Sequence, residues 1–458
     1  MNMYMDDRYK VPTMDEVHKL SSQEKFNVIS LFAGMGGSST GYRMAGAKIL
    51  AVNEFMKAAR SIYNRNYPDT YIFPDDIRTL NGVQMLKKLG LKVGELDLLD
   101  GSPPCASFSM AGKRKKMWGE VKGYSSTKQR VDDLFYEFSR ILKDMQPKTF
   151  IAENVKGLAL GDVKALLGNK GKGLENFFGK ARNVGIIHEK DNIIKTLRAC
   201  GYKVSYKVLN SIEFGVPQIR ERLIFVGVRD DLGMSPSFPE GNKGFRQRPI
   251  KAGDVMFPFI FNGCERNLTH GTKEWDYIHN WFKPLTTLHQ VTKIAKKNNL
   301  KAFCQRMPRD NWFYPHRTIL QSDYNIHALV NRYTAVNESK LLQSFPSDFD
   351  VLGQPFKRIK VSVNDLLKKK FNCYNFQAGQ DSGDIPYICS LVDFPKERWD
   401  EKCFYLDLKE PEIKVDTKSQ YYNILGHSKS NEFVGRAVPP LLMKAVAEHV
   451  YEKIISKI

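Results

Sequence analysis

The residue whose type and setting best suit chemistry is Cys105, which follows the consecutive prolines Pro103 and Pro104. The prolines fix their own φ angles and remove two backbone donors, so they place the thiol on a stiff support. Residues 96–100, just before this turn, are predicted to form a buried strand. Open α/β sheets carry their chemistry at the carboxyl ends of such strands, which makes Cys105 a candidate nucleophile. A lone cysteine is more often an inert core residue, so the interpretation needs support from other residues.

Further reactive side chains follow or begin other predicted strands. Glu153 follows a predicted strand over residues 148–152. A glutamate in that position is often only a solvated cap, but beside a nucleophile it could serve as an acid. Gln218, Arg220 and Arg222 alternate along an extended segment, so their side chains are predicted to share one side. The alternative for this segment is a salt-bridged surface strand.

The elements that position these groups resemble half of a nucleotide-binding unit. A β-prone run over residues 26–32 enters a glycine-rich turn over 33–41, and a helix-like stretch starts at Tyr42. The glycine spacing is not GxGxxG, so pyrophosphate binding is not indicated, and a plain strand-to-helix turn explains the glycines about as well. Further strands are predicted at residues 48–53, 70–73, 206–210 and 222–228. The fold class is α/β: a Rossmann-like domain with a mixed, mostly parallel sheet.

Side chains after the second and third strands suit a nucleoside. Glu54 ends the second strand, where an acid is placed for ribose hydroxyls. Phe55, beside it, could stack on a purine, and Asp76 could accept a hydrogen bond from an exocyclic amine. These positions predict a cofactor that contains a nucleoside and needs no diphosphate.

Composition limits the class of protein and its partners. The chain has 458 residues, a formal net charge of +20, 42% hydrophobic residues and seven cysteines without a CxxC pair. This composition predicts a soluble protein of a reducing cytoplasm without a zinc site or a disulfide framework. No apolar run approaches the roughly 18 residues of a membrane span, and the N-terminus lacks an apolar leader, so no membrane association is expected. The positive charge favours nucleic acid as partner over a generally basic surface, particularly because basic residues crowd positions 113–130.

Six segments, in this order, resemble the motifs of the cytosine-C5 DNA methyltransferases of bacterial or phage type. They are Phe32-Ala33-Gly34-Met35-Gly36-Gly37, Pro103-Pro104-Cys105, Glu153-Asn154-Val155, residues 218–222, residues 332–346, and Gly435-Arg436-Ala437-Val438-Pro439-Pro440. The resemblance covers roughly residues 25–230, 316–350 and 425–458. The chain departs from the family pattern at Ala106, where Gln is usual, at Phe55, where Trp is more common, and at Arg436, where Asn is usual.

The resemblance implies the reaction and the residues that perform it. A cytosine flipped out of duplex DNA would be methylated at C5, with S-adenosylmethionine as methyl donor and Cys105 bonded covalently to C6. Glu153 would act on N3 and the 4-amino group, and Arg222 would hold O2. The implied cofactor residues are Phe32, Gly34, Met35, Gly36, Gly37, Glu54, Phe55, Asp76, Ile77, Pro104, Leu134, Arg436 and Val438. The implied DNA contacts are Ser109, Lys113, Arg114, Gln218, Arg220 and Thr287, and no metal is implied.

The resemblance also predicts the domain organisation and the partners. The expected parts are an N-terminal extension (1–24), a catalytic domain (25–232), a target-recognition domain with the conserved segment after it (233–350), an insertion of unknown role (351–424) and a C-terminal segment that returns to the catalytic domain (425–458). The expected protein is a cytoplasmic, DNA-associated monomer beside an independently acting cognate restriction endonuclease.

Three other functions are compatible with parts of the pattern. An RNA cytosine methyltransferase could use the same fold, but the Cys-Phe-Thr tripeptide usual in the tRNA-acting branch is not matched by Cys403-Phe404-Tyr405. A non-catalytic DNA-binding protein would not need Cys105, Glu153 and Arg222. A nicotinamide oxidoreductase is disfavoured by the glycine spacing. The recognised DNA sequence has no readable code in the chain.

Overall fold

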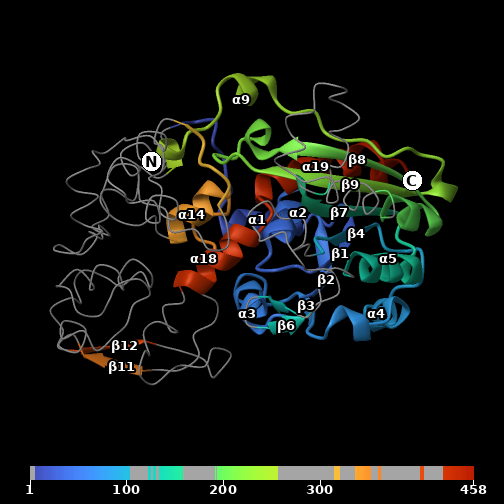
Figure 1. Cartoon of the computed structure of the whole chain (residues 1–458), viewed down its shortest axis with the longest axis horizontal. Helices are drawn as coiled ribbons and strands as arrows, with labels where there is room; N and C mark the ends of the chain where they lie inside the picture. The colour runs from blue at the N-terminus through green and yellow to red at the C-terminus, as the bar shows by residue number, and fades with distance from the viewer. Residues whose placement is uncertain are drawn as a thin grey trace, which may run out of the picture.

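A seven-stranded sheet forms the centre of the protein (Figure 1). The computed structural model describes residues 6–103, 122–124, 127–129, 134–156, 158, 191, 193–255, 314–319, 336–351, 359–362, 403–406 and 427–458. The strand order is β3-β2-β1-β4-β7-β9-β8. The strands are β1 (Asn27–Leu31), β2 (Lys48–Asn53), β3 (Tyr71–Phe73), β4 (Leu98–Gly101), β7 (Thr149–Val155), β8 (Tyr202–Asn210) and β9 (Glu221–Arg229).

The pairing directions confirm the predicted fold class. β3, β2, β1, β4 and β7 are parallel, whereas β9 runs antiparallel to both β7 and β8. The sheet is therefore mixed and mostly parallel. The parallel strands end at one edge, where the carboxyl ends of β1, β2, β4 and β7 gather the side chains that follow them.

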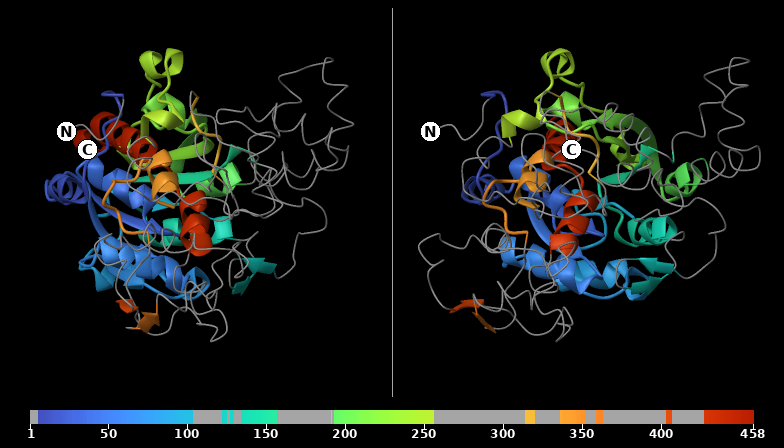
Figure 2. Two further views of the ribbon diagram at one scale, coloured as in Figure 1. Left: turned by 90° about the vertical axis from the view of Figure 1, so that its left-hand side faces the viewer. Right: turned by 60° about the vertical axis from the view of Figure 1, so that its left-hand side comes forward.

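Helices cover both faces of the sheet, because successive strand residues point to opposite sides. Residues such as Val28, Leu98 and Ile151 pack with α1, α2, α3 and α19 on one face. Their neighbours, such as Ile29 and Leu99, pack with α4 and α5 on the other face. In Figure 1, α2 and α5 lie to either side of the strands, and Figure 2 shows the same layers from two further directions.

The helices described have these bounds: α1 (Met14–Ser21), α2 (Gly37–Met44), α3 (Lys57–Asn66), α4 (Gly82–Lys88), α5 (Leu134–Met145), α9 (Lys243–Gln247), α14 (Val336–Leu342), α18 (His427–Arg436) and α19 (Pro440–Lys453). Short 3-10 helices lie at Ile77–Thr79, Ser211–Phe214, Asp230–Leu232 and Ile455–Lys457. Two small antiparallel pairs lie outside the main sheet: β5 (Lys122–Tyr124) with β6 (Thr127–Gln129), and β11 (Ile359–Ser362) with β12 (Cys403–Leu406). No helix in the described ranges is both long and apolar enough to cross a membrane.

Three element boundaries differ from the sequence prediction by three residues or more, and one of them is the start of β8, which lies at Tyr202 instead of residue 206. α2 begins at Gly37 rather than at Tyr42, because the turn is completed at Gly36 and the next glycine already lies in the helix. β7 continues to Val155, so Glu153 lies within the strand instead of after it. The extra length comes from antiparallel pairing, in which Glu153, Asn154 and Val155 face Ile224, Leu223 and Arg222 of β9.

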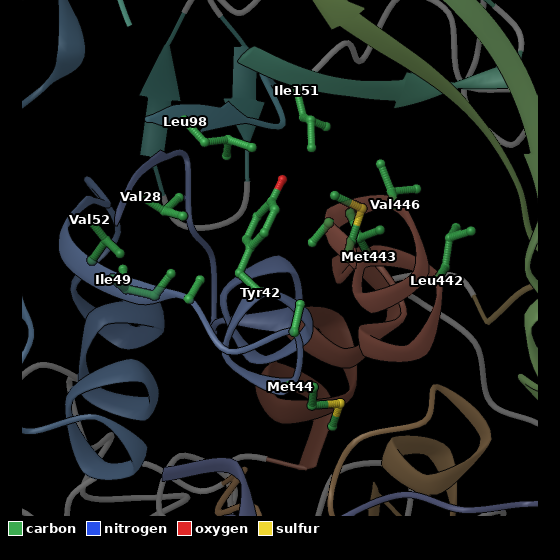
Figure 3. Packing of buried hydrophobic residues seen from close by; sticks show 14 of the residues in the cluster. Val28, Tyr42, Met44, Ile49, Val52, Leu98, Ile151, Leu442, Met443 and Val446 are labelled. Carbon is green, nitrogen blue, oxygen red and sulfur yellow. The ribbon is translucent and has the colours of Figure 1, made fainter. Parts of the chain in front are cut away.

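The C-terminal helix α19 packs closely on α2. A Cβ atom added to Gly41 would collide with the carbonyl oxygen of Pro440, and one added to Gly37 would collide with that of Val438. Figure 3 shows Leu442, Met443 and Val446 of α19 beside Tyr42 of α2 in the shared core. The segment after residue 426 therefore lies against the helix that follows the glycine-rich turn.

Candidate active site

Glu153 and Arg222 form an ion pair on the neighbouring strands β7 and β9. Arg222 Nε lies 2.7 Å from Glu153 Oε1, and the two side chains are only 11% and 10% exposed. Burial lowers the pKa of Arg222, and the Glu153 carboxylate opposes that shift. An arginine keeps its charge even so, and its rigid fork suits a planar oxygen acceptor. The pair therefore places a carboxyl and a fixed cation together at one edge of the sheet.

The glycine-rich turn adopts a backbone that leaves space beside it. Phe32, Gly34 and Gly36 have φ angles of 57°, 58° and 103°, and Gly36 N donates to Ala33 O at 3.0 Å. A Cβ added to Gly34 would meet nothing within 4 Å. Positive φ angles suit glycine, and Phe32 adopts one despite its side chain. The turn is therefore tight, yet its backbone is open to a ligand at Gly34.

Glu54 connects the end of β2 to this turn. Its Oε2 accepts from Gly34 N and its Oε1 from Met56 N, both at 2.7 Å, and the residue is buried. Burial raises the pKa of Glu54, and the two N–H groups together with Arg436 and Arg60 oppose the shift. The carboxyl group is thus fixed beside Gly34 of the turn.

Arg60, which the sequence pattern did not single out, holds the loop that carries Glu54. Its Nη1 donates to the carbonyl oxygens of Glu54, Phe55 and Pro74. These bonds join the ends of β2 and β3. The Phe55 ring beside them is 40% exposed, so it offers an accessible aromatic face next to Glu54. The sequence signal for this role is the position of Arg60 in the first turn of α3, directly after the loop that carries Glu54.

Gln218 and Arg220 do share one side of their segment, as predicted, but that side is the interior. Arg220 is 1% exposed and donates to Ile319 O at 3.0 Å and to Gly435 O at 2.8 Å. Gln218 is fully buried, donates to Leu342 O and accepts from Ile319 N. Ile319 and Gly435 belong to segments far away in the chain. Both side chains tie parts of the protein together, and this burial does not fit the expected DNA contacts.

The other expected cofactor residues lie in varied settings. Asp76 pairs with Arg78 at 3.1 Å and caps the 3-10 helix there, whereas Ile77 is buried. Leu134 is buried at the start of α5, and Val438 is buried against Gly37. Arg436 pairs with Glu432, and its Nη1 lies 3.5 Å from Met56 Sδ, on the Glu54 side of the site. Of these, Arg436 and Val438 lie beside the glycine-rich turn and Glu54.

Asp100 is a buried carboxyl that the sequence pattern passed over. It accepts from Ser30 Oγ at 2.6 Å and from Tyr42 OH at 2.8 Å. The sequence signal for it is a carboxyl group in an otherwise apolar strand, because a buried charge needs hydrogen-bond partners.

Asn154 holds the turn that follows β4: its Nδ2 donates to Pro103 O at 3.4 Å. Asn154 thereby ties the turn before Cys105 to the strand of Glu153.

Comparison with known proteins identifies the family. Residues 26–364 match the model of the family described as C-5 cytosine-specific DNA methylase. The chain belongs to this family. The Type II methyltransferase M.FnuDI of Fusobacterium nucleatum is 35% identical over 338 residues, which cover 70% of this chain and 85% of that protein. M.NgoPII of Neisseria gonorrhoeae, also a Type II methyltransferase, is 28% identical over 362 residues, which cover 74% and 89%.

The fold of the methylase has a counterpart among solved structures. A protein encoded within an E. coli prophage and described as a DNA modification methyltransferase aligns with a TM-score of 0.51 at 17% identity. The alignment covers 94% of this chain and 99% of that one. It supports the α/β fold of the methylase.

Family membership establishes the reaction and its methyl donor. The methylase transfers a methyl group from S-adenosylmethionine to C5 of cytosine in DNA. The observed site fits this cofactor: the turn is open at Gly34, Glu54 presents a carboxyl beside it, and Phe55 offers an exposed ring. A nucleoside with a short amino-acid tail needs such a cradle and no cluster of phosphate-binding amides.

Several expected site residues of the methylase lie outside the described residues. They are Pro104, Cys105, Ser109, Lys113, Arg114 and Thr287. The same holds for residues 256–313 and 320–335, which make up most of the expected part at 233–350, and for most of the insertion at 351–424.

Proposed function

We propose that the methylase acts through Cys105, Glu153 and Arg222 on a cytosine flipped out of a specific duplex DNA sequence. The observation that carries this proposal is the buried Arg222–Glu153 pair at 2.7 Å, at the edge of the sheet from which Pro103 leads to Cys105. An acid, a fixed cation and a proline-braced thiol are the three groups that conjugate addition to a cytosine ring needs.

The Cys105 thiolate adds to C6 and forms the S–C6 bond. Glu153, which takes up a proton from solvent as the cytosine enters the site, donates a hydrogen bond or that proton to N3, which accepts the electron density that leaves the C5–C6 double bond. The Arg222 guanidinium holds O2 in a site that excludes water, where the fixed charge acts strongly. Together these contacts make C5 nucleophilic.

S-adenosylmethionine, when bound, supplies the methyl group that C5 takes up. The C5 proton then leaves to a base, and the electrons of the C5–H bond restore the double bond as the S–C6 bond breaks. Cys105 is released as a thiolate, and Glu153 recovers its starting proton count. The products are 5-methylcytosine in DNA and S-adenosylhomocysteine.

Glu54 accepts hydrogen bonds from the ribose hydroxyls, and the exposed Phe55 ring stacks on the adenine. The proposal for Glu54 is supported by its fixed carboxyl beside Gly34, and the proposal for Phe55 by its accessible ring. Phe32, Met35, Gly36 and Gly37 line the turn, and Pro104, Ile77, Leu134 and Val438 close the apolar side. Arg436 lies at the Glu54 side and supplies positive charge there.

The DNA contacts proposed are Ser109, Lys113, Arg114 and Thr287, for which the basic run over 113–130 and the family resemblance are the support. Gln218 and Arg220 leave this set because their side chains bond to backbone groups inside the protein.

We further propose that the methylase works in the cytoplasm as a monomer and protects sites cut by an independently acting restriction endonuclease. The support for the endonuclease is that M.FnuDI and M.NgoPII are named Type II methyltransferases.

The decisive experiment compares the purified full-length chain with its Cys105→Ser variant. Unmethylated plasmid DNA and unmodified tRNA are incubated with tritiated S-adenosylmethionine, and the DNA is then sequenced after bisulfite treatment. Wild type is expected to label DNA and protect cytosines in one sequence context, while Cys105→Ser retains cofactor binding and loses transfer. Label confined to tRNA, or full activity of Cys105→Ser, would overturn the proposal.

A further inference from the structure

Asp100 is a buried group that the methyl-transfer steps above do not use. The residue is 1% exposed, and it points to the face of the sheet that also carries Glu153. Both carboxylate oxygens are engaged, with Ser30 Oγ donating to one at 2.6 Å and Tyr42 OH donating to the other at 2.8 Å. A carboxyl in an apolar layer is expensive unless such bonds hold it, so the arrangement is specific.

The two partners of Asp100 flank the glycine-rich turn. Ser30 lies in β1 just before the turn, and Tyr42 lies in α2 just after it. Figure 3 shows the Tyr42 ring standing in the core with its hydroxyl directed toward the strands of Leu98 and Ile151. One carboxyl group therefore fixes both flanks of the turn that faces the cofactor.

Asp100 also lies shortly before Cys105 in the chain, in the strand that leads to it. It sits near the end of β4, which closes at Gly101, and the chain then continues through Pro103 toward Cys105. Pro103 is itself held by Asn154 through its carbonyl oxygen. Because prolines stiffen the short link, a shift of the β4 end would be passed on to Cys105.

We propose that Asp100 is a positioning residue for methyl transfer, which keeps the strand end that leads to Cys105 in register with the glycine-rich turn. Its carboxyl group is buried and bonded to Ser30 and Tyr42, and it acts through these contacts. Transfer between two bound groups is sensitive to misplacement of about 1 Å, which can reduce the rate on the order of 100-fold. The inference rests on the proposed role of Cys105.

The electrostatic setting agrees with this role. Burial raises the pKa of Asp100 to about 7, the bonds from Ser30, Tyr42 and Gly101 N oppose the rise, and the charge of Glu153 adds to it. Tyr42 on α2 and Glu153 on β7 are the titratable groups that act on it. Asp100 can therefore hold its partners either as carboxylate or as neutral acid, because hydroxyl groups donate and accept alike.

The test uses Tyr42→Phe, which removes one oxygen atom from the network, with Tyr202→Phe as matched control. Tyr202 is equally buried and donates to Pro147 O at 2.6 Å, but at the opposite end of the strands. Asp100→Ala and Asp100→Asn complete the set, since the amide fills the same space and can still hydrogen-bond both hydroxyls.

Three quantities are measured on folded full-length variants. Calorimetric titration with S-adenosylhomocysteine reports the cofactor site. Release of tritium from C5 of cytosine in DNA, without cofactor, reports Cys105 alone, because addition at C6, protonation at C5 and reversal exchange that hydrogen. Single-turnover methyl transfer reports the two sites acting together.

Tyr42→Phe is expected to slow single-turnover transfer by roughly 10–100-fold while cofactor affinity and tritium release stay within about threefold of wild type. Asp100→Ala should slow transfer more than Tyr42→Phe does, again with cofactor affinity and tritium release nearly unchanged. Asp100→Asn should transfer at close to the wild-type rate. Tyr202→Phe should leave transfer, cofactor affinity and tritium release unchanged. Unchanged transfer in Tyr42→Phe, or equal losses in all three measurements, would overturn the positioning role. Tritium release by Cys105→Ser would instead refute the assignment of the nucleophile.

Discussion

Arg222 Nε lies 2.7 Å from Glu153 Oε1 across the antiparallel pair of β7 and β9. Val155 faces Arg222 directly in the register, so the ion pair runs diagonally across the ladder. Since both side chains are about nine-tenths buried, each charge depends on the other for its solvation. The pair therefore links the stability of this sheet edge to the chemistry proposed for it.

Removing Arg222 should destabilise the protein much more than removing a surface partner. Arg222→Ala leaves Glu153 buried without its cation, and we expect the free energy of unfolding to fall by about 3–5 kcal/mol. Lys48→Ala breaks the pair with Glu24 at 2.8 Å, whose side chains are about half exposed, and should cost about 0–1 kcal/mol. Urea unfolding of both variants is the measurement, and equal losses would contradict the structural account of the pair.

Asp100 should make stability depend on pH. Its pKa is about 7 in the folded protein and 3.8 for the free group, so between these values the unfolded chain has released a proton that the folded chain keeps. This contribution therefore lowers stability as pH rises toward 7, and it levels off above 7. Asp100→Asn cannot titrate. The free energy of unfolding of this variant, taken relative to that of wild type at the same pH, should therefore rise by about 2–3 kcal/mol from pH 5 to pH 8. Urea unfolding across that range measures it. A difference that stays constant with pH would rule out the raised pKa.

Glu54→Gln should weaken cofactor binding and lower the free energy of unfolding by about 1–3 kcal/mol, which leaves the protein folded. The amide oxygen can accept from only one of the N–H groups of Gly34 and Met56, the amide NH2 faces the other, and the charge that would accept from ribose hydroxyls is lost. A hydrogen bond to a charged group contributes about 1.5–3 kcal/mol, so the Kd for S-adenosylhomocysteine should rise roughly 10–100-fold by calorimetry. Glu95→Gln is the control, because Glu95 also accepts from a backbone N–H but lies in an exposed turn before β4. The same Kd in both variants would remove Glu54 from the cofactor site.

Arg220→Met should lower the free energy of unfolding and leave the salt dependence of DNA affinity unchanged. Without the guanidinium, the carbonyl oxygens of Ile319 and Gly435 lose buried donors, at a cost of about 1–3 kcal/mol in unfolding free energy. Affinity for DNA is measured at several salt concentrations, and the slope of log affinity against log salt should match wild type. A slope lower by about one, with unchanged stability, would instead show that Arg220 contacts a phosphate.

Local patterns predicted most of the sheet correctly. The runs that became β1, β2, β3, β4, β8 and β9 stand out because buried strands are short, apolar and bounded by turn residues. The errors at Glu153 and Tyr42 are boundary errors. Antiparallel pairing with β9 extends β7 through Glu153, and tertiary packing against Val438 and Pro440 lets glycines begin α2. Neither the pairing of β7 with β9 nor the contact of α2 with Val438 and Pro440 can be predicted from residues adjacent in the sequence.

The sequence by itself determined the chemistry proposed for this methylase: a proline-braced Cys105, an acid at Glu153, a glycine-rich turn and an acid at Glu54. These are properties of residue type and order, and they carry the family resemblance. Only the tertiary structure decided what the polar side chains contact. It paired Arg222 with Glu153, turned Gln218 and Arg220 inward, and joined Asp100 to Ser30 and Tyr42. Such contacts join residues far apart in the chain, and burial, which sets their charge and strength, exists only once the sheet and its helices have packed.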